Sequence, residues 1–278
     1  MNKSRCLMVV LAHPDDESFG LGGTLALYAK QNTSVHLVCA TRGEAGEIDE
    51  HLMEGFNSIE ERRVFELKCA SKILNLTTID FLGYRDSGMQ NTADNHHPQA
   101  LCRADERVVA EKISHLMKTY QPQVVITFDP NGGYFHPDHI TVHHATVRSF
   151  FQLLKKKNSY YYPKKLYFHI MPMGLLRFSL KLFPLLGLNP RRFGKNKDID
   201  LVEITNHSFP IHARINYRSV SGLKKQATAC YVSQMNERAS HPLIRIIDQM
   251  MNVSDCFMRA YPEHVESNVE RDLFAGLP

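Results

Sequence analysis

The sequence predicts an α/β fold with a mainly parallel β-sheet flanked by helices. Apolar runs of strand length recur along the first 150 residues, and segments with helical spacing of apolar residues separate them. Strands that alternate with helices in this way form right-handed βαβ units, which build parallel sheets. At 278 residues and 43% hydrophobic, the chain is long enough for one substantial core. We therefore expect a single domain over residues 1–278.

The elements follow from these patterns in order. The predicted strands lie at residues 6–11, 35–40, 78–82 and 124–128. The predicted helices run from a glycine-rich entry at 20–23 to about residue 31, over 59–74, over 105–120, and onward from about residue 139. Beyond residue 150 we expect a strand over 200–205, a helix over 215–235 and a closing helix over 243–258. Residues 1–150 are thus the core, and residues 151–278 are a C-terminal elaboration.

An apolar stretch at residues 171–188 is the most unusual part of this elaboration. Arg177 and Lys181 lie four positions apart within it, on one helical face, which is compatible with a helix at a membrane surface. Pro172 and Pro184 limit any continuous helix, so we favour a lid or packing element over the substrate crevice.

Charge and cysteine content exclude several classes of protein. The net charge of +4, from 33 basic and 29 acidic residues, is too small for the basic footprint of a nucleic-acid-binding protein. The six cysteines contain no C-x-x-C pair, so we expect neither a disulfide framework nor a thiolate zinc site, but reduced thiols in the cytoplasm. The apolar stretch at residues 7–12 is too short for a signal peptide or a membrane span. We also expect a homo-oligomer.

Two histidine-rich segments carry the chemistry, A-H-P-D-D-E at 12–17 and H-P-D-H at 136–139. Each follows a predicted strand, so both converge in the crevice beyond the carboxyl ends of a parallel sheet. Catalytic zinc commonly keeps three protein ligands and leaves the fourth position to water. His13 and Asp16 supply two ligands across a proline-containing turn, and His139 supplies the third. His143, one helical turn further on, is the alternative or an additional ligand.

Asp15 is left over beside Asp16 in this assignment. Bound zinc lowers the pKa of its water to about 7, and a nearby carboxylate can then accept the proton and return it to a leaving amine. Asp15 is therefore the candidate general base. The alternative is a purely structural role in a turn or at a helix N-terminus.

These residues resemble the LmbE-like (PIG-L) zinc-dependent N-deacetylases, related to N-acetylglucosaminyl-phosphatidylinositol de-N-acetylase. The resemblance spans about residues 6–150 and implies a Rossmann-like fold. It rests on the segments A-H-P-D-D-E at 12–17, T-R-G-E-A-G-E at 41–47, F-L-G-Y-R-D-S-G-M at 81–89 and F-D-P-N-G-G-Y-F-H-P-D-H at 128–139. The last two most resemble the deacetylase and the conjugate amidase of the mycothiol pathway. Residues 151–200 match no pattern of the family.

At matching positions the resemblance implies that His13, Asp16 and His139 bind zinc and that Asp15 is the general base. It implies that His136 stabilises the tetrahedral intermediate or protonates the leaving amine.

The resemblance gives His136 the partner Asp138. It also implies that Tyr134 can swing toward the substrate carbonyl and that Arg63 binds substrate. Arg85 and Asp86 would face sugar hydroxyls, because a polyol needs several donors and acceptors to fix its orientation. The alternative for Arg85 and Asp86 is an ion pair in a surface turn.

The expected function is that of a metal-dependent hydrolase that removes the N-acetyl group from an N-acetylglucosamine-containing conjugate and releases acetate and a free amine. The expected cofactor is Zn²⁺, with Fe²⁺ possible in the cell, and the partner is a small aminosugar conjugate. One alternative is an amidase that cleaves a larger acyl-aminosugar conjugate of the mycothiol type. Another is a non-catalytic sugar- or metal-binding module. A dinucleotide-binding oxidoreductase is disfavoured, because Leu25 stands where the glycine-rich fingerprint needs Gly or Ala.

Overall fold

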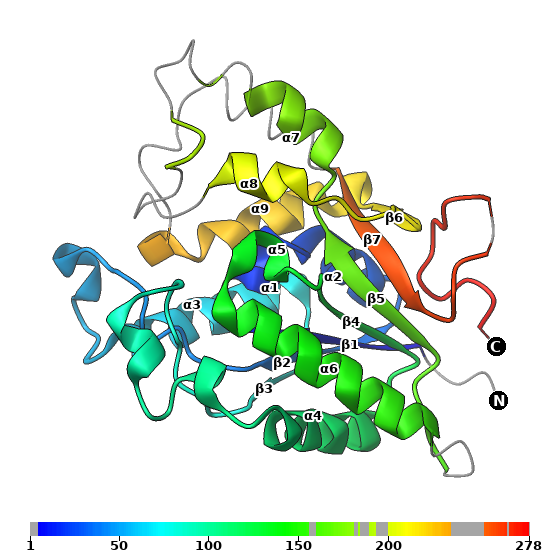
Figure 1. The fold of residues 1–278 in the computed structure, drawn as a ribbon, viewed down its shortest axis with the longest axis horizontal. Helices are drawn as coiled ribbons and strands as arrows, with labels where there is room; N and C mark the ends of the chain where they lie inside the picture. The colour runs from blue at the N-terminus through cyan, green and yellow to red at the C-terminus, as the bar shows by residue number, and fades with distance from the viewer. Residues whose placement is uncertain are drawn as a thin grey trace.

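A seven-stranded β-sheet in the order β3-β2-β1-β4-β5-β7-β6 lies at the centre of the protein, shown in Figure 1 as a computed structural model. The structure describes residues 5–155, 160–180, 183, 189–192, 200–234, 253–265 and 267–277. The five parallel strands are β1 (Cys6–Leu11), β2 (Ser34–Cys39), β3 (Thr78–Phe81), β4 (Val124–Phe128) and β5 (Lys165–Ile170). Strand β7 (Ser254–Tyr261) runs antiparallel to both β5 and β6 (Ala213–Asn216). The predicted α/β fold with a mainly parallel sheet is therefore confirmed.

Helices cover both faces of the sheet, as right-handed crossovers require. Helices α2 (Gly22–Lys30) and α3 (Ile59–Leu74) connect β1 to β2 and β2 to β3, so both lie on one face, where α9 (Ser221–Ala229) packs against them. Helices α4 (Glu106–Tyr120) and α6 (Pro137–Lys155) follow β3 and β4 back across the sheet and pack together on the other face (Figure 1). Strands β1 and β4 are therefore buried along their whole length, which explains their continuous apolar sequences.

The second half of the chain differs from the sequence prediction. The predicted strand at 200–205 is instead helix α8 (Leu201–Asn206), because the Asp200 carboxylate accepts hydrogen bonds from the N–H groups of Val202 and Glu203 and so starts a helix. The helix predicted over 215–235 is replaced at its start by β6, and α9 begins only at Ser221.

The closing helix predicted over 243–258 is also wrong where the structure describes it, since residues 254–258 belong to β7. Residues 243–252 lie outside the described residues. Strand β5 was not predicted at all. Strand β7 depends on a tertiary contact. Asp255 interrupts the apolar pattern of a buried strand, and its carboxylate is buried where it accepts hydrogen bonds from the N–H and hydroxyl groups of Thr24.

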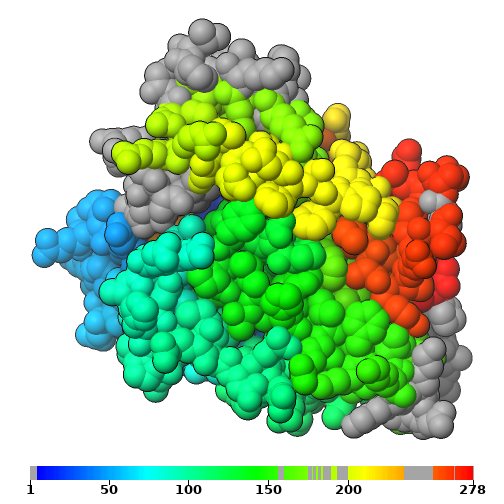
Figure 2. Space-filling view, in the orientation of Figure 1, coloured from blue at the N-terminus to red at the C-terminus, as the bar shows by residue number. Residues whose placement is uncertain are grey.

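Helix α7 (Met173–Leu180) is the main described part of the apolar stretch at 171–188. Met173 and Leu180 form a small hydrophobic cluster with Leu201 of α8, and Tyr134 and Phe135 of α5 (Gly132–Phe135) pack against this cluster. Figure 2 shows the yellow atoms of the α8 region directly above the green atoms of the α5 and α6 region. These contacts support the packing element favoured above; residues 181–182 and 184–188 lie outside the described residues. None of the helices in the described part of the chain is long and apolar enough to cross a membrane.

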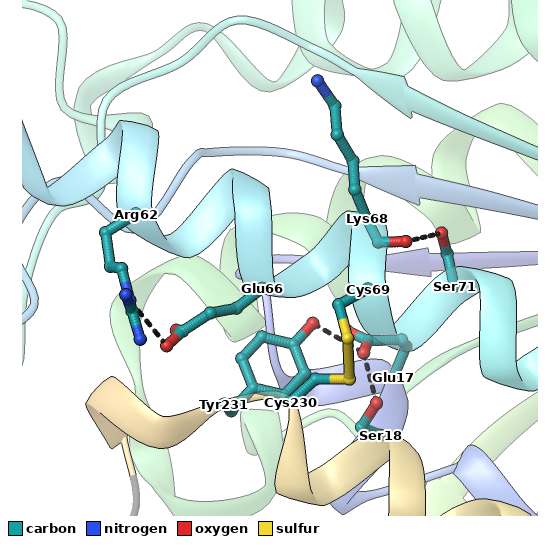
Figure 3. The surroundings of a disulfide bond; sticks show 9 residues. All are labelled: Glu17, Ser18, Arg62, Glu66, Lys68, Cys69, Ser71, Cys230 and Tyr231. Carbon is teal, nitrogen blue, oxygen red and sulfur yellow. Dashed lines mark hydrogen bonds and ion pairs between the residues drawn. A yellow bond between two sulfur atoms is a disulfide. The ribbon is translucent and has the colours of Figure 1, made fainter. Parts of the chain in front are cut away.

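Two of the six cysteines contradict the expectation of reduced thiols. Cys69 on α3 and Cys230, directly after α9, form a disulfide (Figure 3). They are 161 residues apart in sequence, so no local spacing could indicate the pair, and the packing of α9 on α3 brings their Cα atoms to 5.9 Å. The free thiols are those of Cys6, Cys39, Cys102 and Cys256.

The glycine run at 20–23 is a packing feature. A Cβ atom on Gly23 would lie 2.2–2.3 Å from the ring of Tyr217, and one on Gly20 would lie 2.9 Å from the carbonyl oxygen of Asp16. Close approach of α2 to Tyr217 therefore accounts for Gly23 without a phosphate ligand.

We expect Gly23→Ala to lower the free energy of unfolding by about 1–3 kcal/mol, since the added methyl group overlaps the buried ring of Tyr217. Chemical denaturation followed by circular dichroism measures the change. Gly222→Ala is the matched control, because a Cβ at that position in α9 meets no atom within 4 Å and the substitution should be neutral or stabilising. A Gly23→Ala protein as stable as the wild type would show that the ring moves aside without cost.

Candidate metal centre

The two histidine-rich segments meet beyond the carboxyl ends of neighbouring strands, as predicted. The segment at 12–17 follows β1, and the segment at 136–139 follows β4 and opens α6. The strand order reverses between β1 and β4, because the sheet extends from β1 toward β3 on one side and from β4 toward β5 on the other. Such a switch point leaves the crevice in which α/β proteins bind ligands.

Three side chains converge there with the spacing of metal ligands. His13 Nδ1 lies 3.2 Å from His139 Nε2 and 3.6 Å from one carboxylate oxygen of Asp16. The other Asp16 oxygen lies 3.4 Å from His139 Nε2. A tetrahedral zinc ion with bonds of about 2.0–2.1 Å separates its ligand atoms by about 3.3 Å, so the two nitrogen atoms and the Asp16 carboxylate have the spacing of ligands to such an ion. Two further groups of described side chains could also hold an ion at His13, namely His13 with His136 and His139, and His13 with Asp86 and Asp138.

The surroundings of His13 carry a strong negative potential. Burial lowers the pKa of His13, but Asp86, with Asp138 and Asp16, outweighs burial and holds it well above its usual value. Burial lowers the pKa of His139 to about 4, so its ring is neutral and free to donate a lone pair. A buried group of carboxylates is stabilised by a cation, and the donor set therefore fits a divalent metal ion.

The remaining ring nitrogens of the two histidines are held by hydrogen bonds. His13 Nε2 donates to the Asp138 carboxylate at 3.1 Å and lies 3.3 Å from Asp86. His139 Nδ1 donates to the carbonyl oxygen of Gly132 at 3.1 Å. These bonds leave His13 Nδ1 and His139 Nε2 as the metal-facing atoms, the arrangement expected for histidine ligands.

Asp138 has a different partner from the one that the resemblance implies. Its carboxylate accepts from His13 and also from the backbone N–H and the hydroxyl group of Ser87. Only its backbone N–H reaches His136, donating to Nδ1 at 3.2 Å. The expected His136–Asp138 side-chain pair is therefore corrected: Asp138 orients the metal-facing ring of His13.

Asp86 and Arg85 point to different surroundings. Asp86 is buried against His13 and lies 3.9 Å from Arg63, so its carboxylate belongs to the metal centre. Arg85 forms an ion pair with Asp94 at 2.6 Å and lines a separate cavity of about 480 Å³. The two residues that were expected to bind sugar together therefore have different surroundings. The alternative, an ion pair between Arg85 and Asp86, is replaced by the ion pair between Arg85 and Asp94.

Asp15 stands beside the three ligand atoms in an unusual backbone conformation. Its φ is 114° and its ψ is −32°, a region that costs a residue other than glycine about 1–3 kcal/mol. Although it precedes helix α1 (Asp16–Phe19), its side chain makes no capping hydrogen bond, so the structural alternative for Asp15 is not supported. Burial raises the pKa of its carboxyl group to about 7, and Arg63 opposes this rise. Such a value suits a general base at neutral pH.

Arg63 fixes the loop that carries Asp15. Its guanidinium donates to the Asp15 carboxylate at 2.9 Å, to the carbonyl oxygen of Pro14 at 2.5 Å and to that of Gly43 at 3.2 Å. Gly43 has a φ of 78°, and a Cβ there would lie 2.1–2.7 Å from the guanidinium. The glycine of the T-R-G-E segment therefore makes room for an arginine that holds the candidate base.

His136 and Tyr134 complete the centre. Burial, with the nearby His13 and His139, lowers the pKa of His136 to about 3, so the ring is neutral. Because His136 Nδ1 accepts a backbone N–H, its Nε2 carries the proton and can donate it in a hydrogen bond. The Tyr134 ring centroid lies 5.0 Å from that of His139, and burial raises the pKa of its hydroxyl group.

His143, the alternative ligand, is turned away from the centre. Its Nδ1 donates to the carbonyl oxygen of Phe128 at 2.9 Å, and its ring packs against Phe168. Neither candidate ligand group found among the described residues contains it.

A family model described as GlcNAc-PI de-N-acetylase (PIG-L) matches residues 8–150, which hold both histidine-rich segments. The chain belongs to the PIG-L family. This match confirms the resemblance drawn from the motifs.

Two relatives are similar to this chain over more than the region that the family model matches. A 1D-myo-inositol 2-acetamido-2-deoxy-alpha-D-glucopyranoside deacetylase of Salinispora arenicola is 35% identical over 246 residues, which cover 84% of this chain and 78% of that protein. An enzyme of Catenulispora acidiphila with the same name, numbered deacetylase 2, is 31% identical over 99% of this chain and 98% of its own.

A solved structure shows the same fold. The N,N'-diacetylchitobiose deacetylase of Pyrococcus horikoshii superposes with a TM-score of 0.62 and 18% identity, over 92% of this chain and 84% of that one. The α/β architecture with a mixed, mainly parallel sheet is thus shared with a solved deacetylase.

Three residues of the centre received no role from the sequence. Glu17 and Ser87 lie inside segments that carry the family resemblance, so their position was a signal that went unused. Tyr231 donates a hydrogen bond to Glu17 from the far end of the chain, and no motif marks it. Side chains that support a site from another element can be found only in the folded structure.

We expect His139→Ala to lose most bound metal, because the substitution removes one of three ligand atoms. Metal content after gel filtration, measured by plasma mass spectrometry, checks this. His143→Ala removes an imidazole one turn away and should retain the metal. Equal loss of metal in the two variants would place His143 in the ligand set.

Proposed function

We propose that the protein is a metal-dependent N-deacetylase that hydrolyses the acetamide of an N-acetylglucosamine-containing conjugate, releasing acetate and a free amine. The proposal rests on one observation: the three candidate metal ligands and the candidate general base make different contacts in the centre. His13, Asp16 and His139 stand at the spacing of metal ligands, and the neighbouring carboxylate of Asp15 is bound to Arg63 instead. A site that only binds a metal has no use for this additional, partly buried carboxylate.

The metal and the substrate class belong to the same proposal. Two imidazoles and one carboxylate suit Zn²⁺, and they also suit Fe²⁺, so we propose zinc with ferrous iron as the alternative. When bound, the ion supplies a water of lowered pKa and polarises the acetamide carbonyl. Relatives named as deacetylases of an inositol-linked 2-acetamido-2-deoxyglucopyranoside support a glucosaminide with a polyol aglycone as substrate.

Asp15 accepts the proton of the attacking water. Its carboxyl group is partly buried, and its pKa near 7 matches the pH at which such a transfer is most effective. As the carbon–nitrogen bond breaks, the protonated carboxyl group can give the proton to the departing nitrogen, which leaves as the amine. Arg63 keeps the carboxylate turned toward the centre throughout.

His136 and Tyr134 face the carbonyl oxygen, on which negative charge develops. The Nε2–H group of neutral His136 and the hydroxyl of Tyr134 are the donors that the centre offers. Loss of one such donor typically costs about 3–4 kcal/mol of transition-state stabilisation. Both rings lie against His139.

The test is amine release from a panel of N-acetylglucosaminides with different aglycones, using metal-loaded protein. We expect release that a chelator abolishes and added metal restores. Asp15→Asn should retain its metal but lose about 10²- to 10⁴-fold in turnover, because the amide cannot accept the proton. Glu106→Gln, which changes an exposed carboxylate paired with Arg148, is the control.

Loss of metal in Asp15→Asn would move Asp15 into the ligand set. No amine from any substrate, with the metal still bound, would refute the deacetylase. Cleavage of only the larger acyl conjugates in the panel would indicate the amidase instead.

The pH dependence should report the ionisation of Asp15. Because burial raises its pKa from 3.8, the ionised base is lost as the pH falls through that raised value, and kcat/KM declines at or below about pH 7. Arg63→Gln removes a positive charge that lowers the pKa, so the acid limb should move about 1 unit or more to higher pH. A bound cation lowers the pKa in both proteins and leaves the direction of the difference unchanged.

Arg148→Gln, at an exposed ion pair, is the control for charge and should leave the acid limb in place. An unmoved limb in Arg63→Gln would show that the titrating group is not Asp15.

A further inference from the structure

Residues 230–234, which we call the clasp segment, join the candidate site to the C-terminal half of the chain by three links. Cys230 is bonded to Cys69 of α3. The Tyr231 hydroxyl donates to Glu17 at 2.7 Å, and the N–H and hydroxyl groups of Ser233 donate to Glu66 at 2.9 and 2.6 Å. Figure 3 shows Cys230 bonded to Cys69 of α3 and the hydroxyl group of Tyr231 directed at Glu17 of α1.

Glu17 connects the clasp segment to Asp15 by hydrogen bonds. Its side chain is fully buried, and one carboxylate oxygen accepts from Tyr231 and from the Ser18 hydroxyl. The other oxygen accepts the backbone N–H of Asp15 at 3.0 Å. One carboxylate thus joins the clasp segment to the backbone of the proposed base.

Asp15 needs such support because its backbone lies at a positive φ of 114°. A residue other than glycine keeps this conformation only where its surroundings fix it. Glu17 fixes the N–H group of Asp15, and Arg63 on α3 fixes its carboxylate. The disulfide joins the same helix α3 to the clasp segment, so the two supports are tied to each other.

We propose that Glu17 and Tyr231 are positioning residues for Asp15, and that the Cys69–Cys230 disulfide keeps these two residues in place. Reduction of the disulfide therefore lowers turnover. The turnover part of this proposal rests on the proposed deacetylase function. The bridge then acts as a redox-sensitive support of the site.

The reaction at the bridge is ordinary thiol–disulfide exchange with a dithiol reductant. A thiolate of the reductant attacks one sulfur and forms a mixed disulfide, and its second thiol then displaces that sulfur. The reductant leaves as its own disulfide, and Cys69 and Cys230 each gain one electron and one proton. Both cysteines are partly exposed, so a reductant can reach them.

The first experiment compares oxidised and reduced full-length protein by hydrogen exchange, which needs no substrate. The N–H group of Asp15 bonds to Glu17, and those of Ser18 and Phe19 bond to the carbonyl oxygen of Asp15. We expect exchange in the peptide spanning residues 13–19 to become faster when a dithiol reductant opens the bridge. Unchanged exchange in this peptide would overturn the proposal, whether or not the protein is a deacetylase.

The second experiment measures kcat, KM and bound metal for amine release. Reduction should lower kcat about tenfold or more, since displacement of a reacting group by about 1 Å can cost 10²-fold, and reoxidation should restore it. KM and metal content should stay the same. The variant Cys69→Ser/Cys230→Ser should have the low kcat without reductant and should not respond to it.

Matched controls separate positioning from general stability. Cys6→Ala removes a thiol at the start of β1 and should keep full turnover and full sensitivity to reductant. Tyr231→Phe should lower kcat with the bridge intact, which tests the link even if the double cysteine variant does not fold. Tyr161→Phe removes a hydroxyl bonded to Pro122 and should keep the wild-type kcat. A reduced enzyme with a lower melting temperature but an unchanged kcat would make the bridge purely structural and overturn the proposal.

Discussion

The centre depends on the imidazole ring of His13, because its two nitrogen atoms face different parts of the protein. Nδ1 faces Asp16 and His139, where a metal ion fits, and Nε2 donates to Asp138 at the start of α6. The ring therefore joins the end of β1 to the end of β4 at the point where the strand order reverses. Since the ring is buried, it cannot turn without losing its hydrogen bond to Asp138. The geometry of the ligands is in this way fixed by protein contacts alone, and binding of the ion costs little reorganisation.

The fold provides this location but does not select the chemistry, because one fold can support unrelated reactions. The glycine run after β1 illustrates the difference. A similar run binds a pyrophosphate in dinucleotide-binding proteins, whereas here Gly23 admits the ring of Tyr217. What favours hydrolysis is local: Asp15 is partly buried, it accepts a hydrogen bond from Arg63, and burial raises its pKa to about 7. The argument for a deacetylase therefore rests on the residues beyond the strand ends and on the family to which the chain belongs.

Sequence patterns predicted the first half of the fold because β1, β2 and β4 are almost wholly buried and helices α3, α4 and α6 are 15–19 residues long. They failed where tertiary contacts decide the structure. Residues 200–205 look like a strand until Asp200 starts a helix, and β7 contains a buried Asp255 that only Thr24 makes acceptable. The same limit applied to the site. His13, Asp16 and His139 could be chosen from two short motifs, but the pairing of Asp138 with His13 and the Cys69–Cys230 bridge join segments more than a hundred residues apart, and no spacing within the chain encodes them.

The segment at 12–17 explains why so much of the site could still be predicted from one short motif. Its consecutive side chains face different elements: His13 reaches Asp138 on α6, and Asp15 reaches Arg63 on α3. Asp16 accepts the backbone N–H of His13 and faces His139, while Glu17 accepts the hydroxyl of Tyr231 beyond α9. The chain turns at Asp15, whose φ is positive, and passes directly into helix α1, so that the side chains on either side of the turn reach different elements. Three of these contacts lie within the 8–150 region that the family model matches, and the fourth reaches outside it. Glu17 is therefore a point at which the C-terminal half of this chain, which the family model does not cover, contacts the candidate metal centre.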